Sequence, residues 1–283
     1  MSAVLYIMLS LILNSCMTFR ESPRRINRFF EQNKVKGTLD HYHAGSRRME
    51  YAHAGDSTKP MILFIHGSPG SLSAFLWYLT DTTLLNKGFL ITADRPGFGH
   101  SGFGVAEPSL GKQSSALKAL IDEFPTARPV VLVGHSLGGP LIAKIAMDYP
   151  DVVDGLVIVA GSIDPELEPN EVWFRAPLAT PFLSWILPRS LRASNEELYA
   201  LKPELQKMIP RWREITCPAV VVHGRKDKLV PFGNVDFAAR MLINSDVHYI
   251  LDDNAGHFIP WQNEGMVREG ILNVLKRLPK QTE

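Results

Sequence analysis

The sequence predicts an α/β fold with a mainly parallel, doubly wound sheet. Continuous apolar runs rich in β-branched residues recur along the chain, as expected for strands buried on both faces. Segments with helical spacing separate these runs, which is typical of crossover units around a parallel sheet. The runs lie at 61–67, 89–97, 130–136, 155–161, 219–224 and 247–251, and the helices are expected at 71–86, 109–124, 137–149, 232–243 and 262–277.

Two earlier stretches, at 39–44 and 47–54, alternate in polarity around Gly45-Ser46 and predict an antiparallel hairpin. The chain has 283 residues, enough for a large buried core. Its 30 basic and 29 acidic side chains give a formal net charge of +1. This balance gives no electrostatic reason to expect a nucleic-acid partner.

One connection is too long to be a structureless loop in a compact domain. It joins the run that ends at Gly161 to the run that starts at Ala219, and it is rich in proline and aromatic residues. We expect residues 162–213 to form a small, largely helical cap over the carboxyl edge of the sheet, inserted between the sixth and seventh strands. The core would then comprise residues 38–161 and 214–283.

Residues 1–15 predict a signal peptide. The apolar run Val4–Leu13 is too short to span a bilayer as a helix but suits the apolar region of such a peptide. The stretch LNSC, residues 13–16, resembles the lipobox of bacterial lipoproteins, which implies lipidation of Cys16. The chain is therefore expected to be exported and held to a membrane of a bacterial cell envelope. An uncleaved hydrophobic anchor and ordinary secretion are the alternatives.

The segment 16–37 is expected to be a tether between the anchor and the folded domain. Basic residues outnumber acidic ones in it, and a basic segment beside an acyl anchor is attracted to anionic headgroups. A solvated charged linker is the other interpretation. The charged residues are Arg20, Glu21, Arg24, Arg25, Arg28, Glu31, Lys34 and Lys36.

The stretch GHSLG, residues 134–138, fits the pattern G-x-S-x-G between a buried strand and a helix. A sharp turn at this point puts its central residue in strained backbone geometry, and Gly134 and Gly138 leave room for it. Ser136 is therefore the candidate nucleophile. The alternative is a small polar residue that merely fills a turn.

A serine hydroxyl needs a base and an orienting acid to act as a nucleophile. His257, in the loop NAGHF between the last strand and the last helix, is the candidate base. Asp227, in HGRKDKLVP after another strand, is the candidate acid, since a buried carboxylate there would fix the imidazole tautomer. Asp164 in GSIDP is the second choice for this role.

The stretch HGSPG, residues 66–70, places a turn at the same sheet edge. The backbone N–H groups of Ser68 and Leu137 are the expected oxyanion donors, the second one helped by the N-terminus of its helix. The side chain of His66 is expected to be structural. Metal or organic cofactors are not needed for this chemistry.

These stretches, together with DRPGFGHS at 94–101, resemble the recurring motifs of the α/β-hydrolase superfamily in their order and spacing, over about residues 38–278. The resemblance implies a hydrolase with a cap. Epoxide hydrolases and haloalkane dehalogenases of this fold carry an aspartate in place of Ser136, which makes alkyl-enzyme chemistry a poor fit.

The expected reaction is cleavage of a carboxylic ester or thioester through an acyl-enzyme on Ser136. The same residues could cleave an amide or a carbon–carbon bond, because the cap decides the substrate. Aromatic side chains in the cap favour a small-molecule substrate with an apolar portion. A binding protein that has kept the fold without activity is the alternative from another class.

Overall fold

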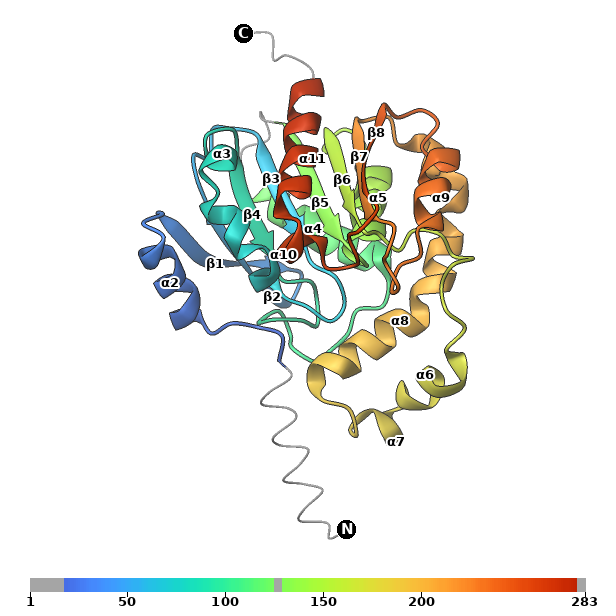
Figure 1. The fold of residues 1–283 in the computed structure, drawn as a ribbon. Coiled ribbons are helices and arrows are strands. Elements are labelled where there is room, and N and C mark those ends of the chain that lie inside the picture. Colours follow the sequence, from blue (N-terminus) through green and yellow to red (C-terminus); the bar gives the residue numbers. More distant parts are fainter. Residues whose placement is uncertain (1–17, 125–128, 279–283) are drawn as a thin grey trace.

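The apolar runs pair into one eight-stranded sheet with helices on both of its faces (Figure 1). The computed structural model describes residues 18–124 and 129–278. The strand order is β1-β2-β4-β3-β5-β6-β7-β8. The pairs β1–β2 and β2–β4 are antiparallel, and all other pairs are parallel. The predicted α/β fold class, with its mainly parallel sheet, is confirmed.

The strands are β1 (Gly37–Ala44), β2 (Arg47–Ala54), β3 (Met61–Ile65), β4 (Phe89–Ala93), β5 (Val130–His135), β6 (Gly155–Val159), β7 (Ala219–Gly224) and β8 (Val247–Asp252). The helices around the sheet are α2 (Pro23–Gln32), η1 (Leu72–Thr80), α3 (Thr82–Leu85), α4 (Leu110–Asp122), α5 (Gly138–Asp148), α9 (Gly233–Met241), α10 (Ile259–Gln262) and α11 (Glu264–Arg277). The cap helices are α6 (Val172–Leu178), α7 (Pro181–Ser184), α8 (Arg189–Met208) and η2 (Ile209–Glu214).

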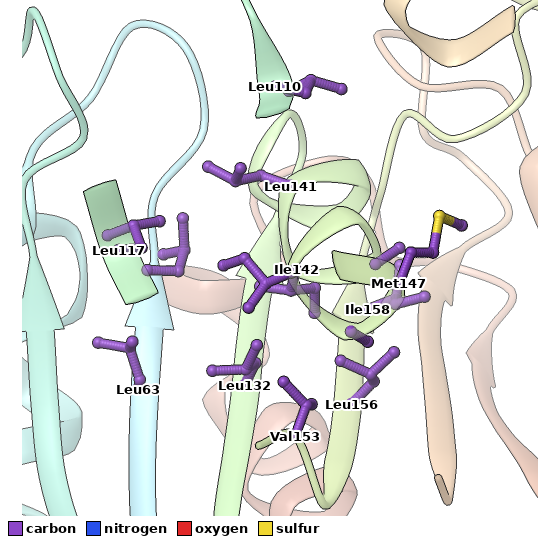
Figure 2. Close-up of a cluster of buried hydrophobic side chains, with 14 of the residues drawn as sticks. Leu63, Leu110, Leu117, Leu132, Leu141, Ile142, Met147, Val153, Leu156 and Ile158 are labelled. Carbon is purple, nitrogen blue, oxygen red and sulfur yellow. The ribbon is translucent and has the colours of Figure 1, made fainter. Parts of the chain in front are cut away.

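Every residue of the five strands from β3 to β7 is buried, because helices cover the sheet on both faces. On one face, Leu63 and Leu132 pack with side chains of α4 and α5, as Figure 2 shows. On the other face, Phe64 and Val133 pack in the cluster that contains side chains of η1 and α11. This burial on both sides explains why the runs are apolar throughout instead of alternating.

The helix expected over 71–86 is divided into η1 and α3. The division falls at Asp81, whose carboxylate accepts hydrogen bonds from the N–H groups of Thr83 at 2.9 Å and Leu84 at 3.1 Å. Such capping satisfies the free N–H groups at the start of a new helix. A capping aspartate inside the apolar pattern therefore starts a second helix.

The cap lies between β6 and β7, as predicted. Its long helix α8 buries Leu201, Leu205 and Met208 in the cluster that also holds side chains of α4 and α5. Helices α6 and α7 bury none of their residues. Figure 1 shows these two short helices at the end of the cap that is farthest from the sheet.

Residues 23–32, which were expected to belong to a tether, form helix α2 and pack on the core. Ile26 is 1% exposed and Phe30 is 3% exposed, and both belong to the same buried cluster as Phe64. They lie four positions apart on one face of the helix, while Arg24 and Arg28 are exposed on the other. We therefore assign this segment to the folded domain.

The predicted signal peptide 1–15 and the predicted lipidation site Cys16 lie outside the described residues. Among the helices that the structure does describe, none combines the length and the apolar character needed to cross a membrane.

Candidate active site

Ser136 lies on the sharp turn between β5 and α5 and has a positive φ of 55°. A β-carbon on Gly134 would lie 2.2 Å from the carbonyl oxygen of Gly138, and one on Gly138 would lie 2.4 Å from that of Ile65. Only glycine fits at these two positions. The backbone around Ser136 is thus strained as the G-x-S-x-G pattern predicts.

His257 and Asp227 come from the loops after β8 and β7, and their side chains meet. His257 Nδ1 lies 2.8 Å from Asp227 Oδ2. Asp227 Oδ1 accepts hydrogen bonds from the N–H groups of Leu229 at 2.9 Å and Val230 at 2.8 Å. Burial acts to raise the pKa of Asp227, but the hydrogen bonds from His257 and the two backbone groups outweigh it, and the pKa is lowered. This carboxylate is built to stay ionised.

The second candidate acid, Asp164, has other partners. Its Oδ1 accepts a hydrogen bond from the N–H of Glu166, and its Oδ2 lies 3.6 Å from the guanidinium of Arg240. The structure therefore brings Asp227 to His257, and it directs Asp164 toward α9.

Ser136 and His257 line one pocket of about 860 Å³ together with His66 and Ser68. Within the described residues, no hydrogen bond joins the side chains of Ser136 and His257. Catalytic hydrogen bonds often tighten only when substrate is bound. Because Asp227 takes the Nδ1 position of His257, the Nε2 atom is the one left to receive a proton from a nucleophile.

His135 contacts both the backbone and the ring of His257. Its Nε2 donates a hydrogen bond to the backbone carbonyl of His257 at 3.0 Å, and the two ring centroids are 4.7 Å apart. Burial and the nearby His257 lower the pKa of His135 to about 3. His135 is therefore neutral near pH 7 and holds the loop in place without adding charge.

The turn that carries Ser68 is fixed by the buried side chain of Arg95. His66 Nε2 accepts a hydrogen bond from the backbone N–H of Arg95 at 3.0 Å, and His66 Nδ1 donates to the carbonyl of Gly67 at 2.7 Å. The guanidinium donates to the carbonyls of His66 at 2.9 Å and Gly67 at 3.0 Å. These bonds agree with a structural role for His66.

Glu197 of the cap helix α8 completes this arrangement. Its carboxylate pairs with Arg95 at 2.7 Å and 3.0 Å, and the two side chains are 1% and 0% exposed. Ser68 Oγ donates to Glu197 Oε2 at 3.0 Å, and Gln113 Nε2 donates to Oε1 at 2.7 Å. The cap is thereby bonded directly to the turn that holds one expected oxyanion donor.

Sequence reasoning did not find this network. Arg95 stands in the motif DRPGFGHS, which the sequence marks only as a stretch that resembles a motif of the α/β-hydrolase superfamily. Glu197 stands beside Glu196 in the polar stretch of α8, and no local pattern in the sequence distinguishes the buried glutamate from the partly buried one. The hint that the sequence does give is Arg95 itself, a charged residue just after a buried strand, which would need an acidic partner such as Glu197.

The segment before α2 forms part of the pocket wall. Thr18, Phe19, Arg20 and Glu21 all line the pocket that contains Ser136. Arg20 donates to the carbonyl of Gly99 at 2.8 Å and stacks on the ring of Phe103 at 4.3 Å. His100 Nε2 donates to the carbonyl of Glu21 at 3.0 Å. A segment expected to be a tether therefore contributes to the site.

Comparison with known proteins places this site in a family. The sequence profile described as "Alpha/beta hydrolase family" matches residues 62–269. The chain therefore belongs to the α/β-hydrolase family, and its relatives identify it as a hydrolase of this class.

A palmitoyl-protein thioesterase, ABHD10, from Bos taurus is 28% identical over 208 residues, covering 70% of this chain and 67% of the relative. A 2-hydroxy-6-oxononadienedioate/2-hydroxy-6-oxononatrienedioate hydrolase from Paraburkholderia phymatum is 26% identical over 268 residues, covering 81% and 91%. A putative lipase structure from Acinetobacter baumannii has a TM-score of 0.68 at 18% identity, covering 90% and 95%, and shows the same fold.

Proposed function

We propose that this protein is a serine hydrolase that cleaves a carboxylic ester or thioester through an acyl-enzyme on Ser136. The observation that carries the proposal is the 2.8 Å contact between His257 Nδ1 and Asp227, in a site where His257 shares its pocket with the strained Ser136. A nucleophile, a base and an orienting acid are the parts that acyl transfer requires.

In the first half of the reaction, Ser136 Oγ attacks the carbonyl carbon while His257 Nε2 takes its proton. The N–H groups of Ser68 and Leu137 donate to the oxyanion that forms, and ionised Asp227 stabilises the imidazolium. The tetrahedral intermediate collapses when His257 gives its proton to the leaving alcohol or thiol. The acyl group then remains on Ser136.

In the second half, water attacks the acyl-enzyme and His257 accepts a proton from that water. A second oxyanion forms in the same place. His257 returns the proton to Ser136 Oγ, which releases the carboxylic acid and restores the enzyme.

A fluorophosphonate probe tests the assignment, because it reacts with an activated serine hydroxyl. The wild-type protein should be labelled, and Ser136→Ala should not. Equal labelling of both proteins would overturn the assignment of Ser136. Failure to label a folded wild-type protein would favour the non-catalytic binding protein instead.

The type of bond that is cleaved needs its own test, because the relatives named above differ in their substrates. One relative is a palmitoyl-protein thioesterase, and the other is a hydrolase named for an oxo-dicarboxylate substrate. A panel of esters and thioesters graded by acyl length, with matched amides and a carbon–carbon substrate, separates them. Preference for the amide or the carbon–carbon substrate would contradict the ester or thioester proposal.

We also propose that Cys16 is lipidated, and that the protein is exported and anchored to a membrane of a bacterial cell envelope. The LNSC stretch supports this proposal, and residues 1–15 would be the signal peptide. Cys16→Ser should release the protein from membranes and abolish incorporation of labelled fatty acid. Unchanged membrane retention, with no labelling of the wild type, would overturn it.

A further inference from the structure

The two short helices of the cap present an aromatic surface to the outside. Helices α6 and α7 contact each other and bury none of their own residues. Grouped exposed apolar side chains of this kind mark a binding surface, whereas single ones are ordinary. The cap surface consists of Val172, Trp173, Phe182, Trp185 and Ile186, whose exposed fractions range from 40% to 82%.

The cap surface also lacks unpaired charge. Between residues 171 and 187 the only charged side chains are Glu171 and Arg175. These two form a salt bridge, and the guanidinium also stacks on Phe174. A surface of tryptophan and phenylalanine without net charge suits the boundary between lipid headgroups and acyl chains.

One wall of the pocket lies close in sequence to the proposed anchor. Thr18 lines the pocket, and only Met17 separates it from Cys16 in the sequence. In Figure 1 the start of the described chain and helices α6 and α7 lie toward the same end of the molecule. Exposed Arg24 and Arg28 on α2 add positive charge near this start, which favours anionic headgroups.

We propose that the cap surface docks on an anionic phospholipid bilayer and that the pocket takes its acyl ester or thioester substrate from that bilayer. This inference rests on the proposed function, since it names the source of the substrate. Docking at α6 and α7 and anchoring before Thr18 would hold the pocket mouth at the headgroup level. An acyl chain could then reach Ser136 without crossing water.

The first experiment measures insertion of the cap surface directly. The full chain is reconstituted into vesicles of phosphatidylethanolamine and phosphatidylglycerol whose acyl chains carry bromine, which quenches nearby tryptophan. Trp173→Phe/Trp185→Phe keeps the surface apolar and should lose most of the quenching seen in the wild type. Trp212→Phe is the matched control, because Trp212 is fully buried and should contribute none. Equal quenching in the wild type and the double variant would overturn docking.

The second experiment measures hydrolysis of an acyl ester embedded in the same vesicles and of a soluble short-chain ester. Trp173→Ala/Phe182→Ala should lower kcat/KM about tenfold for the embedded ester, because interfacial burial of aromatic side chains is lost. Hydrolysis of the soluble ester should stay unchanged. Ile243 is an exposed apolar residue that precedes β8, on the amino side of the sheet and away from the cap. Ile243→Ala should therefore change neither rate. Equal loss for both esters, or no loss, would contradict the proposal.

The failures can be told apart. If Ser136→Ala still hydrolyses both esters, the proposed function fails, while the quenching result still decides docking. Suppose that tryptophan quenching and hydrolysis of the embedded ester are the same in the variants as in the wild type, but that Trp173→Ala/Phe182→Ala turns an oligomer into a monomer. The cap surface is then a contact between copies of this chain. The bilayer proposal would then be wrong.

Discussion

The two halves of the cap differ in what surrounds them. Helix α8 buries Leu201 and Leu205 in the core and places Glu197 against Arg95, beside the turn that carries Ser68. Helices α6 and α7 bury none of their residues and present aromatic side chains outward. One half of the insertion therefore packs on the core and bonds to the Ser68 turn, whereas the other half is exposed to solvent. Substitutions in α8 should therefore cost much more stability than substitutions in α6 and α7.

The largest effect is expected at Glu197. Glu197→Ala leaves the guanidinium of Arg95 buried without its carboxylate, which should lower the free energy of unfolding by about 3–5 kcal/mol. Urea unfolding checks this value. An unfolding free energy equal to that of the wild type would show that water or another residue replaces the pair.

The conservative variant Glu197→Gln separates positioning from folding. It keeps the shape of the side chain but weakens the bonds to Arg95 and to Ser68 Oγ. If the network positions the Ser68 turn as the proposed oxyanion donor, kcat should fall more than KM changes. Binding of a trifluoromethyl ketone, which forms an oxyanion on the serine, should weaken in parallel. Ser68→Ala keeps the backbone N–H but removes the hydrogen bond from Ser68 Oγ to Glu197. Because both substitutions alter this one bond, their effects on kcat in the Ser68→Ala/Glu197→Gln double-mutant cycle should be non-additive.

A somewhat smaller effect is expected at Leu205, which anchors α8 in the core. Leu205→Ala removes a fully buried side chain and should cost about 2–5 kcal/mol of unfolding free energy, depending on how far the cavity collapses. Thermal or urea unfolding measures it. A loss below about 0.5 kcal/mol would mean that α8 is not part of the cooperative core.

Acid should destabilise the core through buried His135, whereas the cap contains no histidine. The folded-state pKa of His135 is about 3, below the ordinary 6.5, so only the unfolded state binds its proton between these values. Stability should therefore fall as the pH drops through this window, by up to about 1.4 kcal/mol per pH unit. His135→Gln should reduce this slope of unfolding free energy against pH. An unchanged slope would assign the acid sensitivity to other groups.

The smallest effect on stability is expected at the cap surface. Phe182→Ala removes a side chain that is 82% exposed, so the unfolding free energy should stay within about 0.5 kcal/mol of the wild type. Urea unfolding checks this value beside Leu205→Ala. A large loss would show that α7 packs against the protein in solution, and it would remove the contrast between the two halves.

Much of the fold and the candidate site could be predicted from the sequence because local patterns encode them. The apolar runs marked the central strands, since burial on both faces leaves no polar alternation. Gly134 and Gly138 predicted the strained turn at Ser136, since a β-carbon at either position would collide with backbone. The loop after β7 favoured Asp227 over Asp164, and the structure brings Asp227 to His257.

Three features were decided only by the tertiary structure. The pair of Arg95 and Glu197 joins residues 102 positions apart, and neither has a neighbour in sequence that reveals the other. Helix α2 is amphipathic and basic, and this sequence pattern fits a tether as well as a helix packed on the domain. Only the burial of Ile26 in the core decides between the two. The wall formed by Thr18–Glu21 depends on bonds from Arg20 to Gly99 and from His100 to Glu21. Periodicity and turn chemistry are properties of neighbouring residues, whereas a buried ion pair exists only after two distant elements have been placed together.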